Sequence, residues 1–167
     1  GVWMLILGID PGLAILGYGL IREKSSTLET LDYGTIETKA GVDMSKRLVR
    51  IYDGVCQLVE EFSPDAVAIE ELFFNKNVKT AIAVGQARGV AIVAAAKYNI
   101  GVYEYTPLQV KQAVVGYGRA EKEQVQSMTK MLLGLREIPR PDDAADALAV
   151  SICHIHHKDM YDKIRCR

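Results

Sequence analysis

The sequence has 167 residues and a formal net charge of −1, and 49% of its residues are hydrophobic and 25% charged. This length suits one domain, expected over residues 1–167. A hydrophobic core of that size can stabilise the fold without disulfides or a structural metal. The composition is that of an ordinary globular protein, and the overall charge gives no sign of a nucleic-acid partner.

Apolar patterns predict strands and helices in a definite order. A continuous apolar run ends in Asp10 and is followed by a Pro11-Gly12 turn, as in a central strand. The predicted strands are Met4–Asp10, Ile15–Glu23, Leu28–Thr38, Ala66–Ile69 and Val102–Tyr105. The predicted helices are Asp43–Phe62, Val78–Tyr98, one opening at Pro107, Glu121–Leu133, and a last one from near Asp142, with a loop at Leu72–Asn77.

The order of these elements predicts an α/β fold. The first three strands have no helices between them and must be antiparallel, whereas the later strands alternate with helices and should be parallel. We therefore expect a mixed five-stranded sheet with helices on its faces.

Basic residues concentrate in the middle of the chain. Residues 1–74 carry 6 basic and 12 acidic side chains, residues 75–130 carry 8 and 3, and residues 131–167 carry 6 of each. A basic segment of net charge +5 attracts phosphates, although lysines and arginines that only solvate helix faces would give the same count.

The remaining composition indicates a cytoplasmic protein. The three cysteines show no CxxC spacing and are expected to be reduced. No signal peptide is recognisable, and the apolar run Ala81–Ala96 is expected to be too short for a membrane span. Gly1–Trp3 precede Met4 and could be a cloning remnant, and residues 157–167 form a C-terminal tail without an assigned role.

Acidic residues stand at positions that a sheet brings together. Asp10 ends the first strand, Glu70 follows the fourth, and Asp143 and Asp146 share one side of the last helix. Carboxylates in one cleft select Mg²⁺ or Mn²⁺, and two such ions can promote phosphodiester cleavage. Taken singly, each acid could instead cap a helix or face solvent.

Two neighbouring acids compete for these positions. Glu71 competes with Glu70, and because side chains alternate along a strand only one of them can face the site. We choose Glu70 because it continues the apolar run directly. Asp142 competes with Asp143 in the same way, and either could be a helix N-cap.

Five blocks of sequence closely resemble the RuvC family of bacterial crossover-junction endodeoxyribonucleases. They are GIDPGLAILGYGLI, AIEELFFNKN, GQARGVAIVAAA, QVKQAVVGYGRAEKEQVQ and DDAADALAV, in this order. The resemblance extends from Met4 to about His156 and implies the ribonuclease H-like fold. It implies a homodimer that nicks two opposed strands of a four-way (Holliday) DNA junction, leaves 5′-phosphate and 3′-hydroxyl ends, and works with the RuvA and RuvB proteins in recombination and repair.

The resemblance also assigns roles to individual residues. The four family acids fall on Asp10, Glu70, Asp143 and Asp146, which would hold Mg²⁺ or Mn²⁺, with two ions expected per site. Lys111 and Lys122 match family lysines near the active site, where they would bind phosphate or stabilise developing charge.

Other residues are expected to contact DNA. Phe73 matches a family aromatic that stacks on or wedges into the junction, whereas we assign its neighbour Phe74 to local packing. Further phosphate-binding candidates are Lys76, Lys79, Arg88 and Arg119, for which a solvated helix face is an equal alternative.

A small-residue stripe and a histidine cluster have two interpretations each. Gly85 and Gly89 could let two copies of a helix approach in a dimer, or could pack on the protein's own sheet. His154, His156 and His157 resemble metal ligands, but we interpret them as favourable residues at a helix end.

Three rival functions remain from the sequence. A sugar-kinase or actin-like ATPase opens with the same strand and D-x-G turn but needs two such domains, for which 167 residues are too few. A non-catalytic junction-binding module would not need four acids. A related nuclease acting on RNA is the third, and the lysine blocks and the LFFNKN loop favour DNA.

Overall fold

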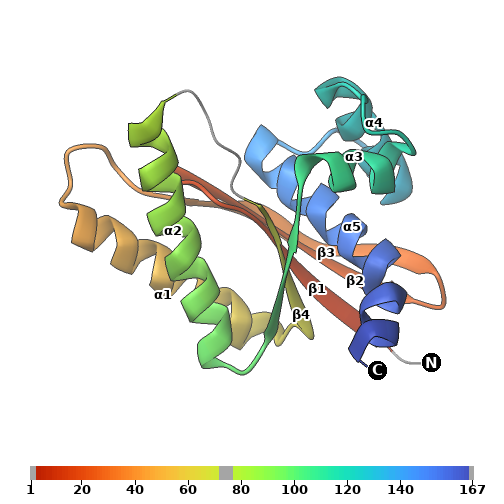
Figure 1. Ribbon diagram of the computed structural model, residues 1–167, viewed down its shortest axis with the longest axis horizontal. Helices are drawn as coiled ribbons and strands as arrows, with labels where there is room; N and C mark the ends of the chain where they lie inside the picture. Colours follow the sequence, from red (N-terminus) through yellow and green to blue (C-terminus); the bar gives the residue numbers. More distant parts are fainter. Residues whose placement is uncertain (1–2, 72–76, 166–167) are drawn as a thin grey trace.

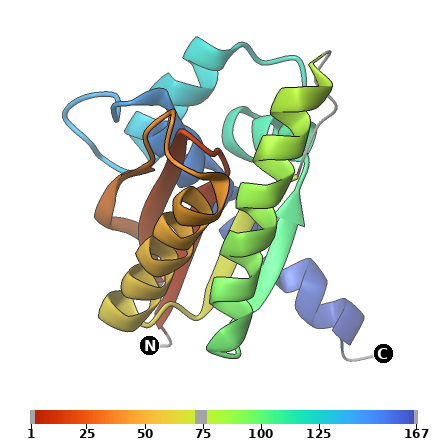
Figure 2. The same ribbon diagram turned by 90° about the vertical axis from the view of Figure 1, so that its left-hand side faces the viewer.

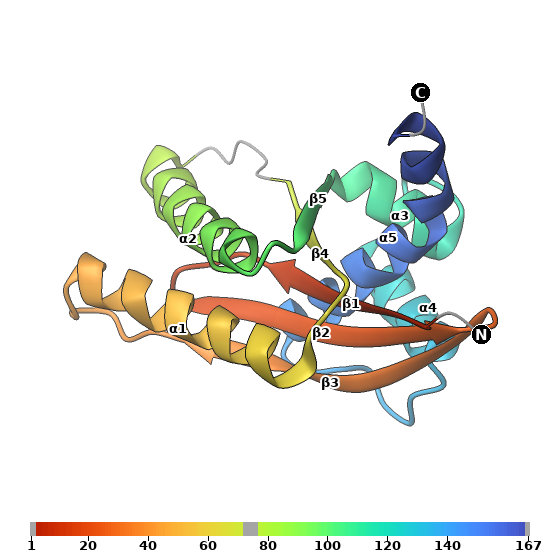
Figure 3. The same cartoon turned by 90° about the horizontal axis from the view of Figure 1, so that it is seen from below.

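The computed structural model describes residues 3–71 and 77–165, and the side chains of residues 159–165 are left out of the description. One five-stranded sheet has helices on both faces (Figures 1 and 3). Its strands are β1 Trp3–Asp10, β2 Ile15–Lys24, β3 Thr27–Glu37, β4 Ala66–Glu70 and β5 Gly101–Tyr105. The helices are α1 Met44–Phe62, α2 Val78–Lys97, α3 Pro107–Val115, α4 Lys122–Leu132 and α5 Asp142–Arg165.

The sheet has the predicted mixed topology. Its strand order is β3-β2-β1-β4-β5. The neighbours β1–β2 and β2–β3 are antiparallel, while β1–β4 and β4–β5 are parallel. The prediction of three antiparallel strands followed by parallel ones is therefore confirmed.

The two faces of the sheet carry separate apolar cores. Ile6 faces a core built with α3, α4 and α5, whereas its neighbour Leu7 faces a core built with α1 and α2. This alternation is the period of two that a strand imposes on its side chains. Figure 2 shows α1 and α2 lying side by side on their face of the sheet.

Helix α2 is less buried than a central core helix. Its buried residues, Ala87, Ala91, Ala94 and Ala95, are small and allow close packing on the sheet. Its 20 residues are long and apolar enough to cross a membrane, whereas the run Ala81–Ala96 was expected to be too short. Length and composition alone are weak evidence for a membrane span, because helices that pack in a protein core can have both.

Both ends of the chain differ from expectation. Trp3 belongs to β1, and its ring lies 4.1 Å from the guanidinium carbon of Arg22, so this residue is part of the fold. Helix α5 continues to Arg165, so the histidines lie within a helix rather than at its end. His154 is buried, with Nδ1 2.6 Å from the Tyr105 hydroxyl, because the helix runs on across the sheet.

Candidate active site

The alternation of side chains along two neighbouring strands turns Asp10 and Glu70 to the same face. Along β1, Leu7 and Ile9 face α1 and α2, so Asp10 faces α5. Along β4, Ala66 and Ala68 face the α5 side, so Glu70 does too. Ile9 pairs with Ile69 in parallel register, which places both acids together at the carboxyl ends of adjacent strands.

Glycines let the first turns of α5 lie directly on these strand ends. Gly17 is the antiparallel partner of Asp10, and a Cβ atom at Gly17 would lie 2.0 Å from the backbone oxygen of Asp143. A Cβ atom at Gly8 would lie 2.0 Å from the backbone oxygen of Ala147. Because no side chain separates helix and sheet, Asp143 and Asp146 come down beside Asp10.

The ionisation of the acids reflects their proximity. Burial, and then the charges of Glu70, Asp146 and Asp143, raise the pKa of Asp10 from 3.8 to about 9. Burial also raises the pKa of Asp146 to about 6, although Lys122 opposes this shift. The pKa of Glu70 is raised by burial and by Asp146, while its hydrogen bond with Asp10 and the charge of Lys111 oppose the shift.

The competing acids lie in different surroundings. Glu71 is exposed, and its backbone N–H donates to the Tyr105 carbonyl at 2.8 Å. Asp142 is 3.0 Å from the Lys122 ammonium, whose hydrogen bond lowers the pKa of Asp142. Neither residue is among the charges that raise the pKa of Asp10, which supports the choice of Glu70 and Asp143.

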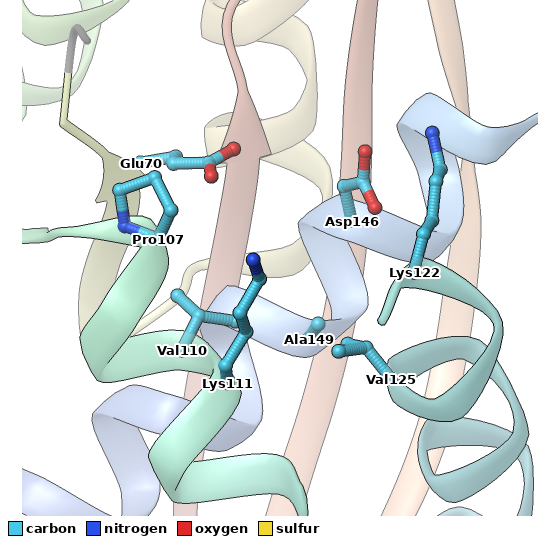
Figure 4. Close-up of a pocket in the computed structure, with 8 residues that line it drawn as sticks. All are labelled: Glu70, Pro107, Val110, Lys111, Lys122, Val125, Asp146 and Ala149. Carbon is cyan, nitrogen blue, oxygen red and sulfur yellow. The ribbon is translucent and has the colours of Figure 1, made fainter. Parts of the chain in front are cut away.

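A pocket of about 260 Å³ opens beside the acids. In Figure 4, Lys111 rises from α3 between Glu70 and Asp146, and Lys122 stands on the far side of Asp146. The lining residues are Glu70, Pro107, Val110, Lys111, Lys122, Val125, Asp146 and Ala149. The sequence singled out the four charged members as site residues and none of the apolar ones, for which it offered no signal.

The donor set fits a hard divalent cation. All four candidate ligands carry carboxylate oxygens, which suit Mg²⁺ or Mn²⁺ better than zinc. Among the residues that the structure describes, no three acidic, histidine or cysteine side chains are already grouped so that they could hold an ion. Asp10 and Glu70 share a hydrogen bond, as two crowded carboxyl groups do when one of them keeps its proton.

The structure describes only some of the other residues that are predicted to contact DNA. Phe73, Phe74 and Lys76 lie outside the described residues. Lys79 and Arg119 are exposed and free to meet a phosphate.

Arg88 has a different environment from these two. Its guanidinium lies 2.5 Å from a Glu104 carboxylate oxygen, and its side chain is only 17% exposed. This ion pair ties α2 to β5 and already matches the charge of Arg88, so the geometry favours a structural role for this residue.

The sheet order and the acids at the ends of β1 and β4 define a ribonuclease H-like nuclease. The family model described as "Crossover junction endodeoxyribonuclease RuvC" matches residues 6–154. The enzyme of that description from Caldanaerobacter subterraneus is 56% identical over 161 residues, covering 96% of this chain and 98% of that relative. The one from Alkaliphilus oremlandii is 60% identical over 153 residues, covering 92% and 93%.

A solved structure agrees with the sequence relatives. The chain superposes on Thermus thermophilus RuvC in complex with a Holliday junction substrate, with a TM-score of 0.90, 40% identity, and coverage of 94% of this chain and 96% of that one. Yeast mitochondrial Ydc2 shares the fold at a TM-score of 0.63 and 13% identity. The chain belongs to the RuvC family of crossover junction endodeoxyribonucleases. The nuclease prediction is therefore confirmed over the kinase-like and non-catalytic rivals.

Proposed function

We propose that this protein resolves four-way DNA junctions by metal-dependent nicking of two opposed strands. Asp10, Glu70, Asp143 and Asp146 hold the ions, which are Mg²⁺ in the cell, with Mn²⁺ able to substitute, and number two per site. When bound, such ions activate water and stabilise the leaving oxygen. Attack on phosphorus with departure of the 3′ oxygen leaves a 3′-hydroxyl and a 5′-phosphate.

The side chains around the acids prepare the phosphodiester for this reaction. Lys111 directs its ammonium to the pocket beside Glu70 and binds the phosphate that is cut or its neighbour. Lys122 is held by Asp142 and offsets the negative charge of Asp146. The apolar floor made by Val110, Val125 and Ala149 limits water around the reacting group.

One observation carries this proposal. Burial and the charges of Glu70, Asp146 and Asp143, which come from elements far apart in the sequence, together raise the pKa of Asp10 to about 9, so these carboxylates lie close to one another. Such repulsion is unfavourable unless a cation offsets it, so the arrangement serves binding of a cation rather than stability.

Mapping the cuts on defined DNA tests the proposal. A synthetic four-way junction and a linear duplex of the same arms are incubated with the protein, with Mg²⁺ or with EDTA. We expect paired nicks at symmetric positions in the junction with Mg²⁺, none with EDTA, and no cutting of the duplex. Cutting of both DNAs at equal rates would contradict junction resolution.

We also infer a homodimer formed through α2. The exposed residues Val78, Ile82 and Val93 follow one another at helical spacing and are 69%, 58% and 58% exposed. A Cβ atom at Gly89 would meet nothing within 4 Å, so Gly89 does not serve packing on the protein's own sheet. An apolar helix face of this kind is typical of a protein interface, and a two-fold dimer presents two sites to two opposed strands.

Replacing Ile82 by glutamate is expected to turn the dimer into a monomer at micromolar concentration. A buried charge at the centre of the apolar face leaves both copies with an unpaired carboxylate, which opposes association. Sedimentation equilibrium measures the mass, with Val49→Glu, at a 57% exposed position of α1, as a control for one added negative charge. A variant that sediments as the wild type would place the interface elsewhere.

The stability of the metal-free protein should depend on pH in a defined direction. The pKa values of Asp10 and Asp146 are raised from 3.8 to about 9 and about 6, so their contribution to stability is greatest below about pH 4 and is lost as pH rises through these values. Mg²⁺ binds the deprotonated acids, so its stabilising effect should grow with pH.

Thermal unfolding at about pH 5.5 and about pH 8.5, with and without Mg²⁺, measures this effect. We expect a larger Mg²⁺-dependent increase in Tm at the higher pH, and a smaller one in Asp10→Asn. An equal increase at both pH values would contradict the assignment of these acids to the metal.

The cellular setting follows from this activity. Junctions of this kind arise in DNA recombination and repair, and the RuvA and RuvB branch-migration proteins are the proposed partners at the same DNA in the cytoplasm. Co-sedimentation of the protein with a RuvA–junction complex tests the association.

A further inference from the structure

A second hollow, of about 380 Å³, shares no lining residue with the pocket of Figure 4. We call it the α2 groove. It lies between the turn that joins β1 to β2 and the first half of α2, and its walls include Leu13, Thr80, Ala83 and Val84. Asp143 lines the α2 groove, whereas Glu70 and Asp146 line the pocket. Three of the four acids therefore line one or the other of the two hollows.

A cationic side chain is fixed at the α2 groove. Arg47 of α1 lines it and donates from Nε to the Thr38 hydroxyl at 2.9 Å. Thr38 is itself bound to the turn, because its N–H donates to the Ala14 carbonyl at 3.0 Å and its hydroxyl donates to the Leu13 carbonyl. Arg47 is thus held against the same turn that forms one wall of the groove.

The charge of Arg47 is not matched by the protein. Among the residues whose side chains the structure describes, no carboxylate forms an ion pair with Arg47, in contrast to Arg88 and Arg140. With Nε used, its two Nη groups remain as a planar donor pair, which suits phosphate. No sequence motif singled out this residue.

The rest of the α2 groove suits the uncharged part of a nucleotide. Leu13, Ala83 and Val84 offer apolar contact surface, and Thr80 adds one hydroxyl. The volume falls in the range of small-ligand sites. A DNA strand whose phosphodiester reaches the acids must continue away from them, and the α2 groove is contiguous with Asp143.

We propose that the α2 groove holds the nucleotide next to the cut phosphodiester, with Arg47 on its phosphate and Leu13, Ala83 and Val84 against its sugar and base. This subsite rests on the proposed function, because it takes the DNA strand that the acids cut. Arg47 is a substrate-binding residue that sets the path of the strand.

Neutralising single phosphates in the DNA tests the subsite. Junctions carry one methylphosphonate at each position within about two nucleotides of the cut, and each is cleaved by wild type and by Arg47→Gln. We expect Arg47→Gln to raise KM about 10-fold on unmodified DNA with little change in kcat, as loss of one charged phosphate contact would do.

The two changes should not add at the phosphate that Arg47 binds. At that position the methylphosphonate should lower kcat/KM of the wild type about 10-fold, through KM. It should hardly change kcat/KM of Arg47→Gln. Arg47→Lys should recover part of the loss. Exposed Arg50→Gln, on the same helix, is the matched control and should show additive effects at every position. Additive effects for Arg47→Gln at all positions would overturn the proposal.

A second variant covers the case in which Arg47→Gln fails to fold. Ala83→Leu narrows the α2 groove without touching the bond from Arg47 to Thr38, and it should also raise KM. With an abasic nucleotide placed in turn at each position within about two nucleotides of the cut, most of that penalty should disappear at one position, whereas a penalty unchanged at every position would contradict the subsite. Because wild-type cleavage is measured in the same assay, absence of any cutting would instead contradict the proposed function.

Discussion

Replacing Asp10 by asparagine is expected to lower the rate of junction cleavage by at least about 10²- to 10³-fold, the loss that follows removal of one preorganised electrostatic group. Asparagine keeps the size of the side chain but removes the charge that a divalent ion requires. Glu70→Gln, Asp143→Asn and Asp146→Asn should behave alike, because the ions need all four ligands.

Junction binding should survive these changes. Lys111 and Lys122 provide phosphate contacts that do not depend on the acids, and removing a negative charge lowers repulsion from DNA. Cleavage under single-turnover conditions and binding by fluorescence anisotropy separate the two properties. Glu71→Gln is the matched control for Glu70→Gln, since Glu71 is exposed and next in sequence. If the variant of one acid cuts at the wild-type rate, that acid is not a ligand of the catalytic ions.

Replacing Gly17 by alanine is expected to destabilise the protein by about 1–3 kcal/mol and to lower cleavage about 10²-fold. The new Cβ atom would lie 2.0 Å from the backbone oxygen of Asp143, so the first turn of α5 must move away from the sheet. That movement carries Asp143 and Asp146 away from Asp10. A backbone clash cannot be relieved by rotating a side chain, which explains the size of the expected effect.

Gly34→Ala is the matched control for this substitution. Gly34 lies in β3 of the same sheet, and the nearest neighbours of its Cβ atom would be side-chain atoms of Tyr18, the hydroxyl at 2.9 Å and two ring carbons at 3.1 and 3.2 Å, rather than backbone. Urea unfolding and cleavage rates of both variants measure the difference. Equal effects of the two substitutions would contradict the role given to the contact between Gly17 and α5.

Local pattern was sufficient to predict the sheet and its acids. Side-chain alternation along a strand allowed only one of Glu70 and Glu71 to face the site, and Glu70 was chosen because it directly continues the apolar run Ala66–Ile69, which is buried throughout. The absence of crossover helices among the first three strands dictated their antiparallel order. These features depend on neighbours in sequence, which is why they could be predicted.

Long-range contacts could not be predicted in this way. The sequence shows Gly17 as a strand residue, but not that a helix more than a hundred residues later lies against it. Arg88 resembles any basic residue on a helix until β5 brings Glu104 to it. The position of Arg47 beside a groove likewise could not be predicted, because the groove forms only when the turn after β1 and the start of α2 come together.

The central claim is that acids from β1, β4 and α5 hold the same catalytic ions. Anomalous scattering from crystals of the protein grown with Mn²⁺ locates such ions directly. We expect manganese peaks within coordination distance of all four acids, Asp10, Glu70, Asp143 and Asp146, and their loss in Asp10→Asn. Manganese bound elsewhere, with these carboxylates free of it, would contradict the assignment.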